Sequence, residues 1–293
     1  MLAAQRRAGI VSLLDSAGAV SVSELATRFE VSDMTIRRDL ENLAEAGLIA
    51  KVHGGAVSPA AGAAAAARRT EEPGFEAKSD QMLPEKQAIA AAAAELLAPG
   101  MSVGLSAGTT TWALAHHLLS VPELTVVTNS PRIAAIFHRA ADARADTHAR
   151  ERAREQVGER ASSAADPKVI LTGGVRTPSD ALVGPLANQA LRSLHLDLVF
   201  LGTHGFSAAA GFTTPNLEEA ETNRTLLESG ARAAVLADHS KWNITALGTF
   251  ARLPQIDALI SDTGLPNAAA AELREQLTLT LAETPETTET RRS

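Results

Sequence analysis

The sequence predicts a small N-terminal domain of helices and a hairpin, followed by an α/β domain with a mainly parallel sheet. Two observations support this prediction. From residue 85 onward, helical runs alternate with short apolar strands, which is the pattern of an α/β domain. Before residue 58, apolar residues instead recur at helical spacing in three short segments. A chain of 293 residues with 45% hydrophobic residues is long enough for two domains.

Composition excludes several classes of protein. The absence of cysteine excludes disulfides and thiolate metal ligands. The longest strongly apolar run, residues 88–97, is well short of the roughly 20 residues that a membrane-spanning helix needs, and the N-terminus lacks the pattern of a secretory signal. We therefore expect a cytoplasmic protein without a membrane partner. The net charge of −7 argues against nonspecific coating of nucleic acid, so any contact with DNA must be local.

The first three elements are predicted as short helices. Residues 3–14 have apolar side chains at helical spacing, which predicts an amphipathic helix. Ser21 and Glu24 form a capping-box pattern, in which each side chain accepts from a free amide at the start of a helix. That helix is expected to run to about Phe29. Ser32 is the predicted N-cap of the next helix, so two short helices are joined by a tight turn.

The third helix has one apolar face and one polar face. Ile36, Leu40 and Leu43 define the buried stripe. The side chains near its N-terminal half that point away from this stripe, or lie on its flank, are candidate DNA contacts, namely Ser32, Met34, Thr35, Arg37 and Arg38. An arginine such as Arg38 can bind guanine with two hydrogen bonds, Thr35 can contact a base or a thymine methyl group, and Arg37 and Ser32 can reach phosphates.

A hairpin is predicted over residues 48–57. It would form a wing whose Lys51 and His53 lie near a DNA backbone. On periodicity alone, a small three-helix bundle with a solvated charged face fits the first 57 residues equally well.

Two segments of biased composition separate the predicted structural units. Residues 58–84 are predicted as an interdomain linker because Pro, Gly and a run of alanines begin this segment, with a continuous helix as the alternative. Residues 139–167 have almost no large apolar side chain and are predicted as an inserted solvated helix or disordered loop. The α/β domain then spans residues 85–282, and residues 283–293 form a polar tail.

Five predicted strands of the α/β domain end in polar turns. These turns follow Leu105, Val127, Leu171, Leu201 and Leu236. In open α/β sheets, ligands bind at the carboxyl ends of the strands, so we expect the five turns to line one pocket. Residues 109–111 at a helix start offer backbone amides and hydroxyls to a phosphate, and Lys241 can add a positive charge. Asp238 and Asn129 can form hydrogen bonds with sugar hydroxyls.

The N-terminal motifs resemble those of the DeoR family of repressors. The resemblance rests on Thr-Ile-Arg-Arg-Asp-Leu at residues 35–40 and on His-Gly-Gly-Ala at residues 53–56, with further matches from Glu24 onward. It implies that residues 1–57 form a winged helix-turn-helix DNA-binding domain, with residues 35–40 in the recognition helix. The family commonly has an arginine in the wing, where this chain has Ala50 and Lys51.

Motifs of the larger domain resemble the sensor domain of the same family. The resemblance implies a fold related to ribose-5-phosphate isomerase and to CoA transferases, which binds a phosphorylated sugar. The effector-binding residues that it implies are Gly108, Thr109, Thr110, Thr111, Asn129, Gly173, Gly174, Asp238 and Lys241. Ser106 stands where the family frequently has an aspartate, which leaves the effector class open.

We therefore expect a regulator that binds a double-stranded DNA operator as a homo-oligomer, with no cofactor, metal or catalytic residue. The resemblance implies a repressor of a carbohydrate-metabolism operon, released from DNA by the effector. A sugar-phosphate isomerase is an alternative, with Asp238 and Lys241 as acid and base, and its further carboxylate would be Glu218, Glu219 or Glu221. An architectural DNA binder whose larger domain only oligomerises is a third possibility.

Overall fold

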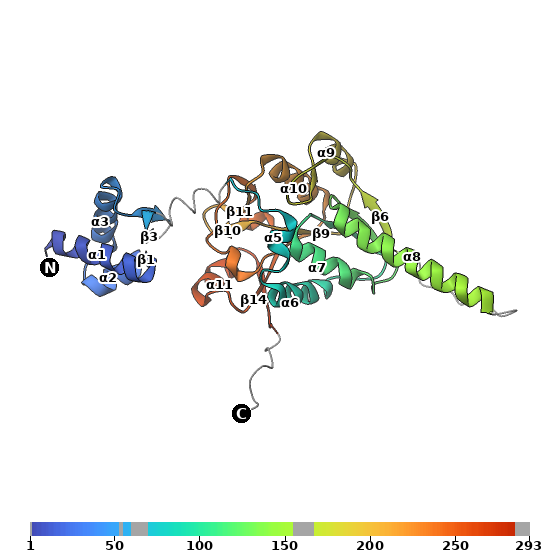
Figure 1. The fold of residues 1–293 in the computed structure, drawn as a ribbon, viewed down its shortest axis with the longest axis horizontal. Coiled ribbons are helices and arrows are strands. Elements are labelled where there is room, and N and C mark those ends of the chain that lie inside the picture. Colours follow the sequence, from blue (N-terminus) through green and yellow to red (C-terminus); the bar gives the residue numbers. More distant parts are fainter. Residues whose placement is uncertain (1, 53–54, 60–69, 155–166, 285–293) are drawn as a thin grey trace, which may run out of the picture. The chain divides into compact units, whose positions relative to one another are not determined.

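The computed structural model describes residues 2–52, 55–59, 70–154 and 167–284 (Figure 1). His53 and the polar tail beyond residue 284 lie outside this part of the chain. The chain divides into two compact units, residues 1–71 and residues 72–293. Each unit is described separately.

The first unit consists of three helices and a small antiparallel sheet. Its elements are α1 (Ala3–Ala17), β1 (Ala19–Ser21), α2 (Val22–Phe29), α3 (Asp33–Glu45), β2 (Ala50–Val52) and β3 (Gly55–Val57). The three helices enclose a core that includes Ile10, Leu25 and Ile36. The sheet has the order β1-β3-β2, so the predicted hairpin of β2 and β3 is confirmed, and β1 adds a strand that was not predicted.

Local capping interactions fix the helices of this unit. The backbone amide of Ser21 donates to Glu24 Oε2 at 3.0 Å, and the amide of Glu24 donates to Ser21 Oγ at 3.2 Å, which is the predicted capping box. Ser32 Oγ accepts from the amide of Thr35 at 3.3 Å, as expected of an N-cap. The sequence therefore specified the starts of α2 and α3 through local interactions.

The wing contains one position that only glycine can occupy. A Cβ atom on Gly55 would lie 2.1 Å from the carbonyl oxygen of Val20. Such a contact is impossible, so a side chain at this position would push β3 away from β1.

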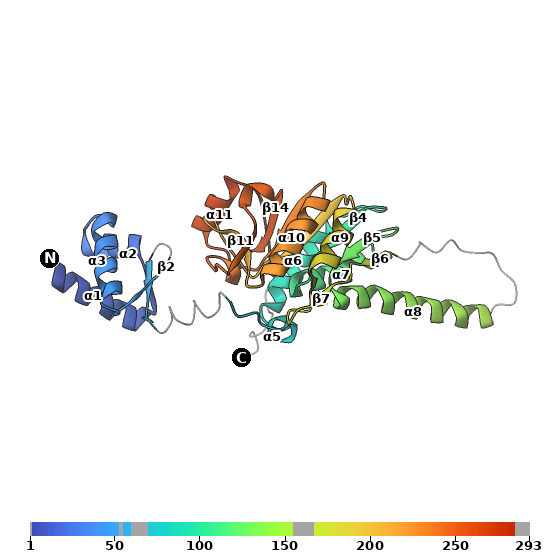
Figure 2. The same cartoon turned by 90° about the horizontal axis from the view of Figure 1, so that it is seen from above.

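The second unit contains a seven-stranded parallel sheet with the order β15-β14-β12-β9-β4-β5-β6 (Figures 1 and 2). In chain order, its strands are β4 (Ser102–Leu105), β5 (Thr125–Thr128), β6 (Lys168–Leu171), β9 (Leu198–Gly202), β12 (Ala233–Leu236), β14 (Ala258–Asp262) and β15 (Thr278–Ala282). Every neighbouring pair is parallel, which confirms the predicted fold class. Smaller antiparallel pairings join β7 (Val175–Arg176) to β8 (Leu182–Val183), and β11 (Gly211–Thr214) to both β10 (Gly205–Ser207) and β13 (Gly248–Ala251).

Helices cover both faces of this sheet. They are α5 (Phe75–Ser79), α6 (Leu83–Ala94), α7 (Thr109–Leu118), α8 (Pro131–Arg154), α9 (Pro185–Arg192), α10 (Leu217–Ser229) and α11 (Asn267–Arg274), with two single turns, η1 (His239–Lys241) and η2 (Leu253–Gln255). Alternate residues of a strand enter different cores: Leu198 and Phe200 pack with α6 and α7, whereas Val199 and Leu201 pack with α10 and α11. No described helix is long and apolar enough to cross a membrane.

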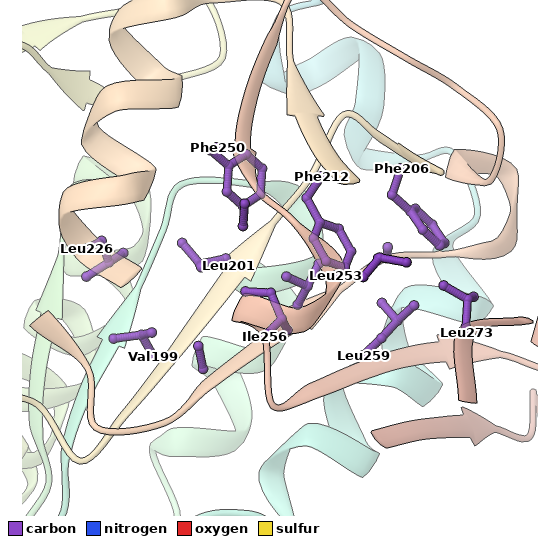
Figure 3. Packing of buried hydrophobic residues seen from close by; sticks show 14 of the residues in the cluster. Val199, Leu201, Phe206, Phe212, Leu226, Phe250, Leu253, Ile256, Leu259 and Leu273 are labelled. Carbon is purple, nitrogen blue, oxygen red and sulfur yellow. The ribbon is translucent and has the colours of Figure 1, made fainter. Parts of the chain in front are cut away.

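The core on the α10 side is built around three aromatic rings (Figure 3). The ring centroids of Phe206 and Phe212 are 5.7 Å apart, and those of Phe212 and Phe250 are 6.2 Å apart. Leu201 and Ile256 pack around them. Because all three rings come from the antiparallel strands β10, β11 and β13, this core attaches the small sheet to the large one.

The two segments of biased composition differ in part from their predicted structure. The second unit begins at residue 72, and α5 with its buried Phe75 lies inside the segment predicted as a linker over residues 58–84. Helix α8 continues to Arg154, so the first half of the predicted insertion 139–167 is helical, one of the two alternatives that the sequence left open. Residues 155–166 lie outside the described part of the chain.

Candidate functional site

The exposed face of α3 carries most of the predicted DNA contacts. Ile36, Leu40 and Leu43 are buried as predicted, while Met34 is 76% exposed and both Arg37 and Arg38 are exposed. Among the described residues, neither of these two guanidinium groups has an ion-pair partner. Ser32 is exposed at the start of the helix and Thr35 is partly buried beside it. The face therefore presents two free cations next to neutral polar groups.

A buried ion pair holds α3 against α1. Arg6 Nε lies 2.5 Å from Asp39 Oδ2, and both side chains are more than 90% buried. Arg7 Nε lies 3.9 Å from the other carboxylate oxygen. No local pattern in the sequence indicates this pair, because the two partners are 33 residues apart. It fixes the position of the exposed face of α3 within the unit.

Lys51 in the wing is paired with the same helix. Its Nζ lies 3.1 Å from Glu41 Oε1, and both side chains are about half exposed. Exposed ion pairs of this kind contribute about 0–1 kcal/mol, so the ammonium group can exchange this partner for a phosphate at little cost. His53, the other predicted wing contact, lies outside the described residues.

The predicted turns of the second unit lie at one edge of its sheet. The turns after β4, β5, β6, β9 and β12 are all at carboxyl ends, and because these five strands are parallel neighbours, the turns are side by side. Asn129 and Ser106 link three of them. Asn129 Oδ1 accepts from the amide of Ala107 at 2.8 Å, its Nδ2 donates to the carbonyl of Leu182 at 3.1 Å, and Ser106 Oγ accepts from the amide of Gly202 at 2.9 Å.

These contacts give Asn129 and Ser106 a structural task. Both polar atoms of the Asn129 side chain have partners within the protein, and the residue is 1% exposed. Ser106 is fully buried, so its hydroxyl also serves the turns rather than an open pocket. The two side chains hold the start of α7 beside the end of β9.

The start of α7 is open to an anion. Gly108 is the N-cap residue, and no side chain caps this helix. The amides of residues 109–111 are therefore the ones that an anion at the helix start can accept from. Thr110 and Thr111 are buried, and Thr111 Oγ1 donates to the carbonyl of Gly108 at 3.1 Å. The backbone amides of this segment, more than its hydroxyls, are therefore the groups that lack a capping partner.

Gly173 and Gly174 shape the turn after β6. Both have positive φ, 76° and 122°. A Cβ atom on Gly174 would lie 2.6 Å from the carbonyl oxygen of Val183. The second glycine thus allows the turn to pack closely against β8.

Asp238 and Lys241 lie at the end of β12. Asp238 is buried, and its Oδ1 accepts from the amide of Ser240 at 3.1 Å and from the hydroxyl of the same residue. This caps η1, which carries the partly buried Lys241. Next to it, His239 Nδ1 lies 2.6 Å from Asp262 Oδ2 at the end of β14.

The charge of Lys241 acts on Lys78, Lys86 and His204, three residues that no motif in the sequence indicates. Lys86 Nζ donates to the carbonyls of Lys78 and Gln81, both at 2.5 Å. Burial lowers the pKa of Lys86 to about 8, and the charges of Lys241 and Lys78 act in the same direction. Burial also lowers the pKa of His204 to about 4, again with Lys241 and Lys78 contributing. The charges of Lys241 and Lys78 therefore act on both Lys86 and His204, while Asp238 opposes the shift of Lys86.

The charges of two carboxylates, Glu219 and Glu72, also act on Lys78. Burial raises the pKa of Glu219 to about 7, while the nearby Lys78 acts against this rise. Ser179 Oγ donates to Glu219 Oε2 at 3.2 Å. Although burial raises the pKa of Glu72, hydrogen bonds from Asn216 and Ser179 hold it below its ordinary value.

The missed residues had weak signals in the sequence. Lys78 and Glu72 lie in the segment predicted as a linker, and nothing local marks them as part of a folded domain. Glu219 was considered only as the carboxylate of an isomerase. A separate cleft of about 590 Å³ opens at the opposite, amino edge of the sheet, lined by Arg224, Arg232 and Asp257 among others, and it includes none of the predicted residues.

Comparison with known families matches both units. The model of the DeoR-like helix-turn-helix domain matches residues 6–61. The model of the DeoR C terminal sensor domain matches residues 81–146 and 156–263. The gap between the two parts of this second match falls inside the predicted insertion.

Curated relatives match along nearly the whole chain. The HTH-type transcriptional regulator GlpR of Haloferax volcanii is 35% identical over 278 residues, which cover 94% of this chain and 95% of that protein. The glycerol-3-phosphate regulon repressor of Escherichia coli is 30% identical over 263 residues, covering 89% of this chain and 92% of that protein. The L-fucose operon activator of Haemophilus influenzae is 31% identical over 262 residues, covering 88% and 91%.

Among solved structures, ribose 5-phosphate isomerase from Plasmodium falciparum is similar with a TM-score of 0.35 and 11% identity, covering 55% of this chain and 52% of that one. The assignment of this protein rests instead on the two family models and on the curated relatives. The chain belongs to the DeoR family of transcriptional regulators, with a DeoR-like helix-turn-helix domain followed by a DeoR-type sensor domain.

Proposed function

We propose that this protein is a cytoplasmic repressor of a carbohydrate-metabolism operon, and that a phosphorylated sugar releases it from its operator. The observation that carries this proposal is that the uncapped start of α7 lies at the same carboxyl edge of the sheet as Lys241, whose charge acts on Lys78 and Lys86. Such an arrangement suits a phosphate monoester. Curated relatives support the choice of effector class, since one is named a glycerol-3-phosphate regulon repressor.

The DNA-binding residues are proposed from the exposed face of α3 and from the wing. Arg38 and Thr35 would contact base edges in the major groove, with Met34 beside them. Phosphates would be bound by the other members of the set, Ser32, Arg37, Lys51 and His53.

The effector-binding residues divide into two groups by what the structure offers. The amides of Thr109, Thr110 and Thr111 after Gly108 would bind the phosphate, with Lys241 adding a charge. Asn129, Gly173, Gly174 and Asp238 would shape the site, because their side chains or backbones are already engaged in holding its turns.

The same protein is proposed to act as a homo-oligomer. Two copies would place two recognition helices on two half-sites of an operator. Release requires that the effector bind the free and the DNA-bound arrangements with different affinity, since a ligand with equal affinity for both shifts nothing.

An operator selected from random duplex DNA with the full-length protein provides the test. We expect enrichment of one repeated motif, and we expect a phosphate ester such as glycerol 3-phosphate or fructose 6-phosphate to weaken binding to it in a gel-shift assay. The unphosphorylated sugars serve as controls. If no ester changes either the affinity for DNA or the melting temperature, the domain only oligomerises and the sensing function is wrong.

An isomerase is a second candidate because of one observation. Glu219 is a carboxyl group with a pKa raised to about 7 near Lys78, which are properties of a general base. Family membership favours the regulator, because a relative named as a transcriptional regulator matches this chain along nearly its whole length. Rapid conversion of ribose 5-phosphate to its ketose by a protein that selects no DNA motif would reverse this choice.

A further inference from the structure

The segment between the start of the second unit and α6 lies across the carboxyl edge of the sheet. We call residues 72–82 the strap. Its partners are the first turns of α7 and α8, the N-cap of α10 and the loop between β7 and β8. Helices that follow parallel strands start at the carboxyl edge, so the strap lies over the edge that holds the proposed effector site. Figures 1 and 2 both show α5, its helical turn, beside α7.

Glu72, the first residue of the strap, attaches it to the rest of the second unit. Its Oε1 accepts from the amide of Ser179 at 3.1 Å, and its Oε2 accepts from Nδ2 of Asn216 at 2.8 Å. We call these three residues the Glu72 clasp. Asn216 Oδ1 in turn accepts from the amides of Glu218 and Glu219, at 3.0 Å and 3.1 Å. The clasp therefore acts on the same helical turn that carries Glu219.

The middle of the strap is held by aromatic and ionic contacts. The rings of Phe75 and Trp112 meet edge to face, with centroids 6.0 Å apart, and the guanidinium of Arg132 lies 4.5 Å above the Phe75 ring. Arg132 also pairs with Glu76 at 2.8 Å. Trp112 is in the first turn of α7, so the strap packs directly on the helix whose start is proposed to bind phosphate.

The far end of the strap supplies a lysine to the site. Lys86 holds this end by binding two strap carbonyls, which positions Lys78. Lys78 is partly buried, and burial lowers its pKa, with Glu219 and Glu72 opposing and Lys241 reinforcing the shift. The charges of Glu219, Glu72 and Lys241 thus all act on the ammonium group of Lys78.

We propose that the strap covers the effector site and that Lys78 binds the anionic group of the effector together with Lys241. The Glu72 clasp couples this binding to the residues that lead to the DNA-binding unit. This inference rests on the proposed function, because it names a further ligand contact and the regulation of the same site. The physical reason is competition. An anion that binds Lys78 weakens the attraction between Lys78 and the carboxylates of Glu72 and Glu219. Binding of the effector therefore destabilises the clasp, and an intact clasp weakens binding of the effector.

The first test measures binding of the effector class. Glycerol 3-phosphate and fructose 6-phosphate are titrated calorimetrically into the full-length protein, into Lys78→Met and into Lys168→Met, a matched control at an exposed lysine of β6. We expect Lys78→Met to weaken binding of the active ester by about tenfold or more, because it removes a charge-assisted contact. The control is expected to bind as the wild type does.

The second test separates binding from coupling. Glu72→Ala removes the clasp, and Glu71→Ala changes the exposed neighbouring residue. We expect Glu72→Ala to bind the ester at least as tightly as the wild type but to lose most of the roughly 5–150-fold release from the operator that allosteric coupling typically gives. Glu72→Gln keeps one acceptor oxygen, so we expect the ester to release it from the operator to a degree between those of the wild type and Glu72→Ala. Hydrogen exchange at the Glu72 end of the strap is expected to rise when the ester binds the wild-type protein, because the clasp is weakened.

The outcomes distinguish the two proposals. If no ester binds the wild type, the proposed function fails and the strap inference fails with it. If an ester binds and releases the wild type from DNA but Lys78→Met binds it equally well, or if Glu72→Ala is released normally, the inference alone is overturned.

Discussion

Arg38 is one of the two side chains, with Thr35, that are proposed to contact base edges and so to give DNA binding its specificity. It is exposed on α3, and the described residues provide no acidic partner for it. We expect Arg38→Ala to weaken binding to the selected operator by about 1–3 kcal/mol and to relax preference at one base pair. Titration against single-base variants of the operator measures both effects. Lys241→Ala is the matched control, expected to retain operator binding and lose release by the ester. Equal loss of operator binding in both variants would contradict the assignment.

Asp39 holds α3, the helix that carries Arg38, in place through a buried ion pair with Arg6. Asp39→Ala leaves the guanidinium of Arg6 buried without its carboxylate, and removal of one partner from such a pair costs about 3–5 kcal/mol. We expect a loss of this size in the stability of the first unit, measured as faster hydrogen exchange of the α3 amides. Asp33→Ala, at an exposed position of the same helix, should cost about 1 kcal/mol or less. If both variants lose the same amount of stability, the ion pair does not contribute to the stability of the first unit as described.

Glu219 gives the second unit a defined dependence on pH. Its pKa is about 7 in the folded protein and 4.5 in the ordinary state, so folding favours the protonated carboxyl. The contribution of the protonated Glu219 carboxyl to folding stability is fully present below pH 4.5 and is lost as pH rises through about 7. Glu219→Gln, which stays neutral, should therefore gain stability relative to the wild type over this interval. Melting temperatures from pH 4 to 8 measure the difference, with exposed Glu218→Gln as control. A difference that does not vary with pH would sink this prediction.

Among the elements, the aromatic core that joins the small antiparallel sheet to the large sheet offers the sharpest test of packing. Phe212 is fully buried between Phe206 and Phe250. We expect Phe212→Ala to reduce the free energy of unfolding by about 3–5 kcal/mol, from lost burial and a residual cavity. Leu186→Ala on α9, where the side chain is 69% exposed, should change it by about 0.5 kcal/mol or less. Denaturant unfolding followed by circular dichroism compares them, and similar losses would argue against the packing described.

What the sequence could predict at this scale depended on how local the signals were. The starts of α2 and α3 follow from Ser21 and Ser32, whose partners are three residues away. Strand β1 was missed because its pairing partner is β3, where Ala19 lies opposite Val57. Three residues without periodicity do not indicate a strand by themselves.

The candidate sites were also predictable only where the signal is local in the sequence. The sequence placed five turns at one sheet edge, because parallel strands end together. It could not show that Asn129 is occupied by Ala107 and Leu182, since the latter contact spans 53 residues. It also could not show that the segment with Lys78 lies at this edge, because contacts between distant residues hold it there, such as those of Phe75 with Trp112 and of Glu72 with Asn216.

At the scale of the whole molecule, function depends on how many recognition helices engage one operator. A homo-oligomer with two helices on one face of DNA requires half-sites about 10–10.5 base pairs apart, or multiples of that distance. Insertion of about 5 base pairs between the half-sites rotates one to the opposite face and should abolish cooperative binding, whereas insertion of about 10 should restore part of it. Gel-shift titrations of the three operators, with sedimentation of the free protein, measure this. A monomer that binds one half-site as tightly as the full operator would show that each recognition helix acts alone, and release would then have to occur within a single chain.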